Sequence, residues 1–233
     1  GNGDYNVVVL APASVQEMAD FVDLSFEIAF KYRNPVMILS DGVIGQMMEK
    51  VVLPPIKPRL TEEEIAEKYP WAANGHGLKK RKPNILTSLE MDPAVMEQRN
   101  IHLQKKYEEI KKNEVRYETI QCDDADYIIV AFGSAARVSQ KAIEIARSEG
   151  IKLGLFRPIT LWPFPYKEIE QLSARIKGIL VAEINGGQMV YDVRLATGKG
   201  IPVEYFGRQG GIVPAPDEIV NALKSKIINS AKS

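Results

Sequence analysis

Four turns rich in glycine or proline carry the residue types best suited to chemistry in this chain. Each follows a run of apolar residues that predicts a buried strand. They are Gly133-Ser134, Arg157–Pro165 (RPITLWPFP), Glu183–Gln188 (EINGGQ) and Gly207–Gly211 (GRQGG). Bare backbone amides at the start of a following helix can hold an anion such as a phosphate. Glycine is also needed in such turns simply for positive φ and close packing. An anion site and a purely structural turn are therefore both compatible with the pattern, and the structural role is favoured.

Motifs of conventional nucleotide, nucleophilic and metal sites are missing from the sequence. No turn has the G-x-G-x-x-G pattern or a Walker A lysine, and no G-x-S-x-G element occurs. Cys122 has no histidine nearby, and His76 and His102 lack the spacing of metal ligands. Asp41-Gly42 resembles the start of the thiamine diphosphate signature, but no Asn pair follows. The sequence therefore predicts neither a catalytic residue nor a metal site.

Composition sets the broad class of the protein. Lys+Arg and Asp+Glu both number 30, so the net charge is zero and does not indicate binding to nucleic acid or to an anionic membrane. No apolar run is long enough to span a membrane. The single cysteine excludes an internal disulfide and an iron–sulfur cluster held by this chain alone, since such clusters need about four thiolates. A reducing, cytoplasmic location fits this usage.

The segment Arg157–Pro165 connects a predicted strand, Ile151–Phe156, to a predicted helix, Tyr166–Ile176. Its three prolines fix φ and remove backbone donors, which predicts a stiff connection that interrupts both strand and helix. In open α/β sheets, ligands and partners bind at the carboxyl ends of the strands. The segment is either a connector with Trp162 and Phe164 packed in the core or a binding surface.

Residues 5–53 read as strand, helix, strand. The first strand is Tyr5–Leu10, and Ser14 with Glu17 predicts a capping box at the start of the helix. The second strand is Val36–Leu39. The apolar stripe of the helix is too wide for a single-sided surface helix, and so small a unit seldom folds alone. We therefore expect a domain cut partway through, covered by its missing half, by the second domain or by a partner chain.

The rest of the chain divides into a polar middle section and a complete α/β pattern. Residues 54–116 predict a linker with a long helix over 94–116, and the basic run Lys79–Lys82 fits a solvated loop better than an import signal. Residues 117–233 alternate strands with helices, which predicts a mainly parallel sheet. The strands after a short one at Arg116–Ile120 are Tyr127–Phe132, Ile151–Phe156, Gly178–Ala182 and Val203–Phe206. A helix that ends at Ser148 follows the first of these four, and the later helices are Tyr166–Ile176, Met189–Ala196 and Pro216–Ile228.

Taken together, these motifs resemble a known family. The stretch Val7–Glu49 (VVVLAPASVQEMADFVDLSFEIAFKYRNPVMILSDGVIGQMME) is similar to the α-subunit of 2-oxoacid:ferredoxin oxidoreductases, closest to the 2-ketoisovalerate, or branched-chain, branch. The resemblance continues through Gly133–Pro165, Val181–Arg194 and Gly207–Ile219. It covers nearly the whole chain, and residues 54–116 are its least distinctive part.

The resemblance implies an α/β fold in two parts. Residues 1–53 would be the C-terminal part of a thiamine-pyrimidine-type domain, and residues 54–116 a linker with a long helix. Residues 117–233 would form a transketolase C-terminal-like, three-layer α/β/α domain with a mainly parallel sheet. The implied reaction is oxidative decarboxylation of a 2-oxoacid, 2-ketoisovalerate, to acyl-CoA with reduction of ferredoxin. Thiamine diphosphate, Mg²⁺ and iron–sulfur clusters would belong to the complete complex, and none is expected on this fragment.

The resemblance also bears on site residues and partners. The glutamate that activates the aminopyrimidine and the substrate contacts would precede Gly1, so the fragment itself is expected to be inactive. Five residues are candidates for lining a coenzyme or subunit interface: Asp41, Gly45, Gln46, Asn185 and Gln188. Transketolases carry a His in the region aligned with Asn185, so a transketolase-like proton transfer there is in doubt.

The partners implied are the other subunits, a second copy of the chain, and ferredoxin and CoA through the complex. Nucleic acid and membranes are not expected. A non-catalytic dimerisation and docking module is the alternative function, and anion binding at Gly207–Gly211 is a third hypothesis.

Overall fold

The computed structural model describes residues 3–75 and 82–230. Its contacts divide the chain into two compact units, Gly1–Val52 with Lys106–Ser233, and Leu53–Lys105. His76 and most of the basic run, residues 79–81, lie outside the described residues. No helix in the described ranges is both long and apolar enough to cross a membrane.

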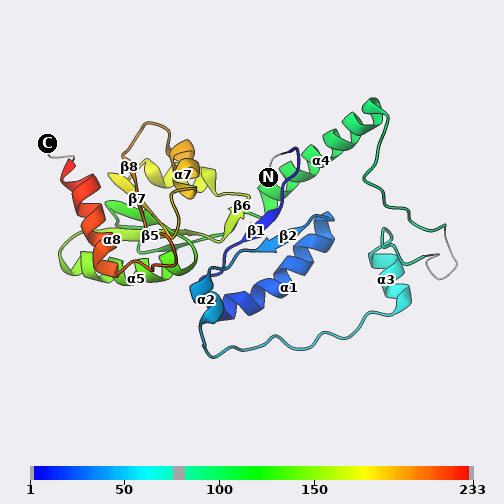
Figure 1. The fold of residues 1–233 in the computed structure, drawn as a ribbon, viewed down its shortest axis with the longest axis horizontal. Helices are drawn as coiled ribbons and strands as arrows, with labels where there is room; N and C mark the ends of the chain where they lie inside the picture. Colours follow the sequence, from blue (N-terminus) through cyan, green and yellow to red (C-terminus); the bar gives the residue numbers. More distant parts are fainter. Residues whose placement is uncertain (1–2, 76–81, 231–233) are drawn as a thin grey trace. The chain divides into compact units, whose positions relative to one another are not determined.

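A three-stranded sheet organises the first fifty residues. Its order is β2 (Val36–Ile38), β1 (Val8–Leu10), β6 (Thr160–Trp162), with β1 parallel to β2 and antiparallel to β6. Helix α1 (Val15–Tyr32) connects β1 to β2. The first two strands were predicted, but β6 comes from the proline-rich segment some 120 residues later (Figure 1). The early part of the chain therefore shares a sheet with the later part.

The strand β6 corrects the expectation that the proline-rich segment interrupts strand structure. Strand β5 (Leu153–Pro158) continues through Pro158, and β6 follows after one residue. A proline removes only its own donor. The amides of Ile159 and Thr160 remain, and both donate to the carbonyl of Arg116. The amide of Ala11 donates to the carbonyl of Ile159, so the backbone between the prolines is satisfied by pairing.

The second sheet has the predicted, mainly parallel arrangement. Its order is β3 (Tyr117–Ile120), β5, β4 (Tyr127–Val130), β7 (Gly178–Glu183), β8 (Val203–Gly207), and only β3 runs antiparallel to its neighbour. Residues of β7 alternate between its two faces. Leu180 and Ala182 join one core cluster, whereas Ile179 and Val181 join the other.

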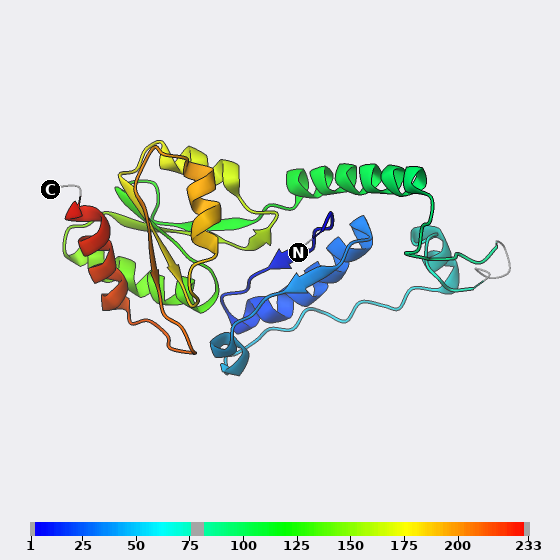
Figure 2. The same ribbon diagram turned by 45° about the horizontal axis from the view of Figure 1, so that its top comes forward.

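Helices cover both faces of this sheet, which gives three layers (Figures 1 and 2). Helices α5 (Gly133–Ser148) and α8 (Pro216–Leu223) pack on one face, and α6 (Tyr166–Ser173) and α7 (Met189–Thr197) on the other. The predicted last helix continues beyond α8 as a π-helical turn, Lys224–Ile228. The α/β/α fold class is therefore confirmed.

Three further helices complete the described chain. The long helix predicted over 94–116 is α4 (Pro93–Asn113), and its buried residues are Tyr107 and Ile110. The short helices α2 (Gly42–Gln46) and α3 (Glu62–Lys68) were not predicted. At five and seven residues, they are too short to show a helical period of apolar residues.

Part of the wide apolar stripe on α1 lies exposed. Phe21 and Ile28 are buried, whereas Val22, Phe26 and Phe30 are exposed, Phe26 by 59%. The rings of Phe26 and Phe30 stack with centroids 6.3 Å apart. One side of the apolar stripe is therefore buried in the unit, and the other side is exposed to solvent.

The two aromatic residues of the proline-rich segment have different environments. Phe164 is 6% exposed and belongs to the core cluster beneath α6 and α7. Trp162 is half-buried and meets the ring of Tyr107 edge-to-face at 5.7 Å. The core-packing interpretation holds for Phe164, while Trp162 keeps part of its ring at the surface.

We predict that Phe164→Ala lowers the free energy of unfolding by about 3–5 kcal/mol, since a large side chain leaves a closed core. Trp162→Ala should lower the free energy of unfolding by a smaller amount, because part of the Trp162 ring is already exposed to water. Urea unfolding of the two variants beside the parent chain measures both. Equal losses would contradict the different burial of the two rings.

Candidate functional site

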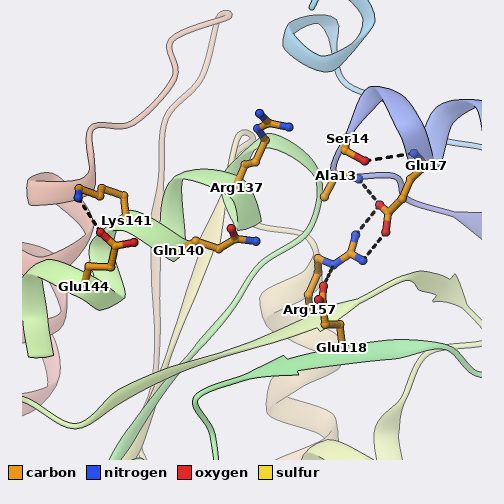
Figure 3. Close-up of a pocket in the computed structure, with 9 residues that line it drawn as sticks. All are labelled: Ala13, Ser14, Glu17, Glu118, Arg137, Gln140, Lys141, Glu144 and Arg157. Atoms are coloured by element: carbon orange, nitrogen blue, oxygen red, sulfur yellow. Dashed lines mark hydrogen bonds and ion pairs between the residues drawn. The ribbon is translucent and has the colours of Figure 1, made fainter. Parts of the chain in front are cut away.

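A buried arginine lines the pocket shown in Figure 3. The side chain of Arg157, from the end of β5, is only 4% exposed. Its two terminal nitrogens donate to the two carboxylate oxygens of Glu17 at 2.8 and 2.6 Å. Its Nε donates to Oε2 of Glu118 on β3 at 2.8 Å. This bidentate geometry is the strongest that a guanidinium makes with a carboxylate.

Glu17 also fixes the turn between β1 and α1. The Ser14 hydroxyl accepts from the amide of Glu17 at 3.1 Å, as predicted for the N-cap. The Glu17 carboxylate accepts from the amide of Ala13 at 2.7 Å, one residue before the cap, so only half of the predicted capping box forms. The turn after β1 is thereby tied to β5 through Arg157.

The ion pair shifts the pKa of Glu17. Burial by itself would raise the pKa of this carboxyl group, but the hydrogen bonds from Arg157 and from the Ala13 amide outweigh it. The pKa of Glu17 therefore lies below its ordinary value of 4.5. Glu17 is a permanent anion at neutral pH and not a proton donor.

The pocket around this pair has a volume of about 520 Å³ and balanced charge. Arg137 pairs with Glu49 at 2.5 Å, and Lys141 pairs with Glu144 at 2.6 Å. Each charged side chain that lines the pocket thus has a partner of opposite sign. The arrangement can hold elements together, but it presents no unpaired acid, base or nucleophile.

Asp41, a predicted interface residue, caps two helices at once. Its Oδ1 accepts from the amides of Val43 and Ile44 in α2 at 3.0 and 3.1 Å. Its Oδ2 accepts from the amide of Ser134 at 2.8 Å, and the Ser134 hydroxyl donates to Oδ1 at 2.5 Å. The anion position at the Gly133-Ser134 turn is therefore filled by the chain's own carboxylate.

The glycine at this turn has a defined reason. Gly133 has φ +57, and a Cβ there would lie 2.7 Å from Oδ2 of Asp41. Burial would raise the pKa of Asp41, but the hydrogen bonds from Ser134 and from the α2 amides outweigh it, so the pKa is lowered. Gly45 and Gln46, the next two candidates, lie exposed on α2 beside this cap.

A third carboxylate joins the far end of α1 to the start of β3. Glu114 is buried and accepts from Lys31 at 2.8 Å, from the Tyr32 hydroxyl at 2.7 Å and from Arg116 at 2.8 Å. Burial would raise its pKa, but the bonds from Lys31, Tyr32 and Arg116 outweigh it and the pKa is lowered. Both ends of α1 are thus held through an acidic side chain.

The turn with Asn185 and Gln188 is built around Glu183, whose side chain fills the anion position of α7. Glu183 is 1% exposed, and its carboxylate accepts from the three consecutive amides of residues 188–190 at 2.9–3.2 Å. The Asn185 Nδ2 also donates to it at 3.1 Å. The Asn185 Oδ1 in turn accepts from the amide of Gly187 at 2.7 Å. Asn185 therefore shapes the turn, and Gln188 begins the helix.

Sequence reasoning did not assign a role in the site to Arg157, Glu17 or Glu183. The available signal was a charge placed directly at the end of a strongly apolar strand, because a buried charge requires a partner. For Arg157 that partner is 140 residues away, and no local pattern identifies it. The structure places the Asp41 group and the Asn185 group at the N-termini of different helices, α5 and α7.

The single cysteine is not a nucleophile in this fold. Cys122 is buried, and its Sγ donates to the carbonyl of Leu155 at 3.1 Å. Burial raises the pKa of its thiol to about 11. The thiolate is therefore scarce at neutral pH.

Two family models match the chain. The model described as pyruvate flavodoxin/ferredoxin oxidoreductase, thiamine diphosphate-binding, matches residues 2–119. The chain belongs to this family. The model of pyruvate:ferredoxin oxidoreductase core domain II matches residues 125–219. The two matches fall on either side of the start of the five-stranded α/β/α part.

Curated relatives support the family assignment. The chain is 44% identical over 214 residues to the ketoisovalerate oxidoreductase subunit VorB of Methanothermobacter thermautotrophicus, covering 91% of this chain and 58% of the relative. It is 30% identical over 261 residues to the 2-oxoglutarate synthase subunit KorA of Methanothermobacter marburgensis, covering 95% of this chain and 64% of the relative. The chain thus spans about three fifths of the length of these family members.

Solved structures share the fold. A 2-oxoglutarate:ferredoxin oxidoreductase from Magnetococcus marinus, with 2-oxoglutarate, coenzyme A and succinyl-CoA bound, superposes with a TM-score of 0.75 at 25% identity. The match covers 97% of this chain and 43% of that one. A split-gene transketolase superposes with a TM-score of 0.52 at 16% identity, which shows a common fold alone.

The description of the matched family names thiamine diphosphate. A diphosphate needs amide donors or a metal ion, but Asp41 and Glu183 occupy the amides at two of the four glycine- or proline-rich turns. No group of three or more His, Cys, Asp and Glu that could hold a metal occurs among the described residues. The amides of these two turns are therefore not available to a diphosphate.

We predict that the carboxylate ties make stability fall at acid pH. The folded pKa values of Glu17, Asp41 and Glu114 are lowered, so their stabilisation is complete above the ordinary pKa of 3.8–4.5. It is lost as the pH falls through the lowered values. The melting temperature, followed by circular dichroism from neutral to acid pH, should therefore decrease below about pH 4.5.

The variant Glu17→Gln should be less stable at neutral pH by about 3 kcal/mol, because it leaves the buried Arg157 with one partner fewer. It should also lose part of the acid dependence. Glu144→Gln is the matched control, since its ion pair with Lys141 is exposed. If both variants show the parent's dependence on pH, Glu17 does not contribute as described.

We further predict that Glu183→Ala lowers the free energy of unfolding by about 2–3 kcal/mol, since buried amides lose their acceptor. The emptied helix N-terminus should then accept sulfate. Added sulfate should raise the melting temperature of the variant more than that of the parent, with sodium chloride at equal ionic strength as the control. An equal rise in both proteins would indicate only the general effect of the salt.

Proposed function

We propose that the chain is part of the α-subunit of a thiamine-diphosphate-dependent 2-oxoacid:ferredoxin oxidoreductase. The complete enzyme would oxidatively decarboxylate 2-ketoisovalerate to its acyl-CoA and reduce ferredoxin. The observation that carries the proposal is the 44% identity to a ketoisovalerate oxidoreductase subunit across 91% of the chain. Identity to the 2-oxoglutarate synthase subunits is 29–32%.

The fragment's own role would be structural. We assign residues 1–53 to a pyrimidine-binding-type domain, 54–116 to a linker and 117–233 to a transketolase C-terminal-like domain. Thiamine diphosphate, Mg²⁺ and the iron–sulfur clusters would be held by the complete cytoplasmic complex, through which CoA and ferredoxin are engaged. Asp41, Gly45 and Gln46 on one side, and Asn185 and Gln188 on the other, would face the coenzyme or a neighbouring subunit.

A docking module without a catalytic role is the second candidate. It is favoured by exposed apolar side chains on two helices of the same unit, Phe26 and Phe30 on α1 and Tyr191 and Leu195 on α7. Large exposed apolar residues close together mark interaction surfaces. A second copy of the chain or another subunit would cover them.

The decisive experiment is co-expression of the full-length subunit containing this chain with its neighbouring subunits. The purified complex should reduce a viologen dye in the presence of CoA, with a higher kcat/KM for 2-ketoisovalerate than for 2-oxoglutarate or pyruvate. A complex that assembles but reduces dye with none of the three acids would favour the docking module. A preference for 2-oxoglutarate or pyruvate would overturn the substrate assignment.

Isothermal titration calorimetry of the 233-residue chain tests the role of the fragment separately. No tight binding of thiamine diphosphate is expected in the presence of Mg²⁺, because two of the chain's glycine turns already hold its own carboxylates. The assembled complex is the positive control. Tight binding by the chain alone would contradict the assignment of the coenzyme site to the complete enzyme.

A further inference from the structure

A second pocket, formed where the proline-rich segment meets the end of α4, differs in character from the ion-pair pocket of Figure 3. It has a volume of about 520 Å³ and lies within one compact unit. Its walls include Trp162, Pro163 and Tyr166. This size is typical of small-molecule sites.

The charge around this pocket is positive. Lys111 and Lys112 enter from α4, and Lys167 enters from the first turn of α6, against one acidic residue, Glu168. Lys111 pairs with Glu108 only through an exposed contact at 2.8 Å, which contributes little. The pocket therefore combines exposed ammonium groups with aromatic rings, in a chain whose net charge is zero.

The helix that begins at this pocket also differs from its neighbours. The first turns of α5 and α7 receive carboxylates from Asp41 and Glu183, and at α8 Glu218 accepts from the amide of the N-cap residue Ala215. At α6 the N-cap residue is Pro165, whose side chain makes no cap hydrogen bond, and the amide of Tyr166 donates to the carbonyl of Phe164. The amides of α6 add to the positive potential that the lysines create.

The aromatic rings of the pocket are held in place. Trp162 meets Tyr107 edge-to-face at 5.7 Å, and Tyr166 meets Phe164 at 5.0 Å. The hydroxyl of Tyr166 donates to Asp192, which fixes the outer end of that ring. An aromatic side chain held in this way offers a stacking surface for a planar base.

We propose that this pocket binds a nucleotide that carries a purine base and at least two phosphates. The base would stack on Trp162 or Tyr166, and the phosphates would contact Lys112 and Lys167 near the start of α6. Lysine ammonium groups bind phosphate as point charges. The inference does not depend on the substrate of the complete enzyme.

The intrinsic fluorescence of Trp162 tests the proposal in the full 233-residue chain. The chain has two tryptophans, so Trp71→Phe leaves Trp162 as the reporter. Titration with ADP should quench it saturably, and adenosine or pyrophosphate alone should bind at least roughly tenfold more weakly, because each lacks one half of the contacts. ADP and coenzyme A, which share the adenosine diphosphate group, are titrated separately to tell a free nucleotide from a nucleotide-containing cofactor.

In that background, Lys112→Gln with Lys167→Gln should raise the Kd for ADP at least roughly tenfold. The double arginine variant should retain binding. Lys152→Gln with Lys177→Gln is the matched control, because it removes the same charge from exposed positions away from the pocket. Unchanged melting temperatures would show that the variants fold.

Two results would overturn the proposal. One is the absence of saturable quenching at millimolar ADP, and the other is equal affinity in the glutamine variant and its matched control. A polyglutamate peptide that binds this pocket where ADP does not would also refute it, and would identify the surface as a contact for an acidic polypeptide.

Discussion

The buried guanidinium of Arg157 is the contact on which the arrangement of this protein depends. It leaves the end of β5 and binds Glu17 at the start of α1 with both terminal nitrogens, while its Nε binds Glu118 on β3. A charge that is 4% exposed would be strongly destabilising without such partners. The same contact therefore ties the start of α1, after β1, to strands β5 and β3.

The remaining polar contacts follow the same principle. Carboxylates from outside the helices complete their first turns, as the distant Asp41 does for α5 and the nearby Glu183 does for α7. Each satisfies backbone amides that would otherwise be buried without an acceptor. Glycine-rich turns that suggest a ligand site from their sequence can thus be occupied by the protein itself, and their glycines serve close approach, as at Gly133.

This organisation bears on what the chain can contribute to the proposed enzyme. The ion-pair pocket has balanced charge and the cysteine is buried, so neither offers a reactive group. The unit instead has exposed apolar side chains that another protein surface could contact, namely the phenylalanines of α1 and the exposed residues of α7. The proline-rich segment serves both purposes, because Thr160 and Phe164 are buried while Trp162 lines a basic pocket.

Local patterns in the sequence determined the order of elements, the mainly parallel sheet and the family. Apolar runs such as Ile128–Val130 and Leu153–Phe156 identify buried strands, and helical spacing identifies α5, α6 and α8, because these signals depend on near neighbours alone. Short elements such as α2 and α3 carry no such period. Asp41 and Asn185 could be selected as candidate interface residues from the turns in which they occur. Their hydrogen-bond partners could not be predicted from those turns.

Only the tertiary structure decided which partners the buried charges have. Arg157 and Glu17 are 140 residues apart, and Asp41 and Ser134 are 93 apart. The pairing of β6 with β1 likewise depends on the carbonyl of Ile159 meeting the amide of Ala11. The sequence shows that a buried charge or backbone donor needs a hydrogen-bond partner. Which group becomes that partner depends on how the whole chain packs, because such contacts form only when distant segments meet.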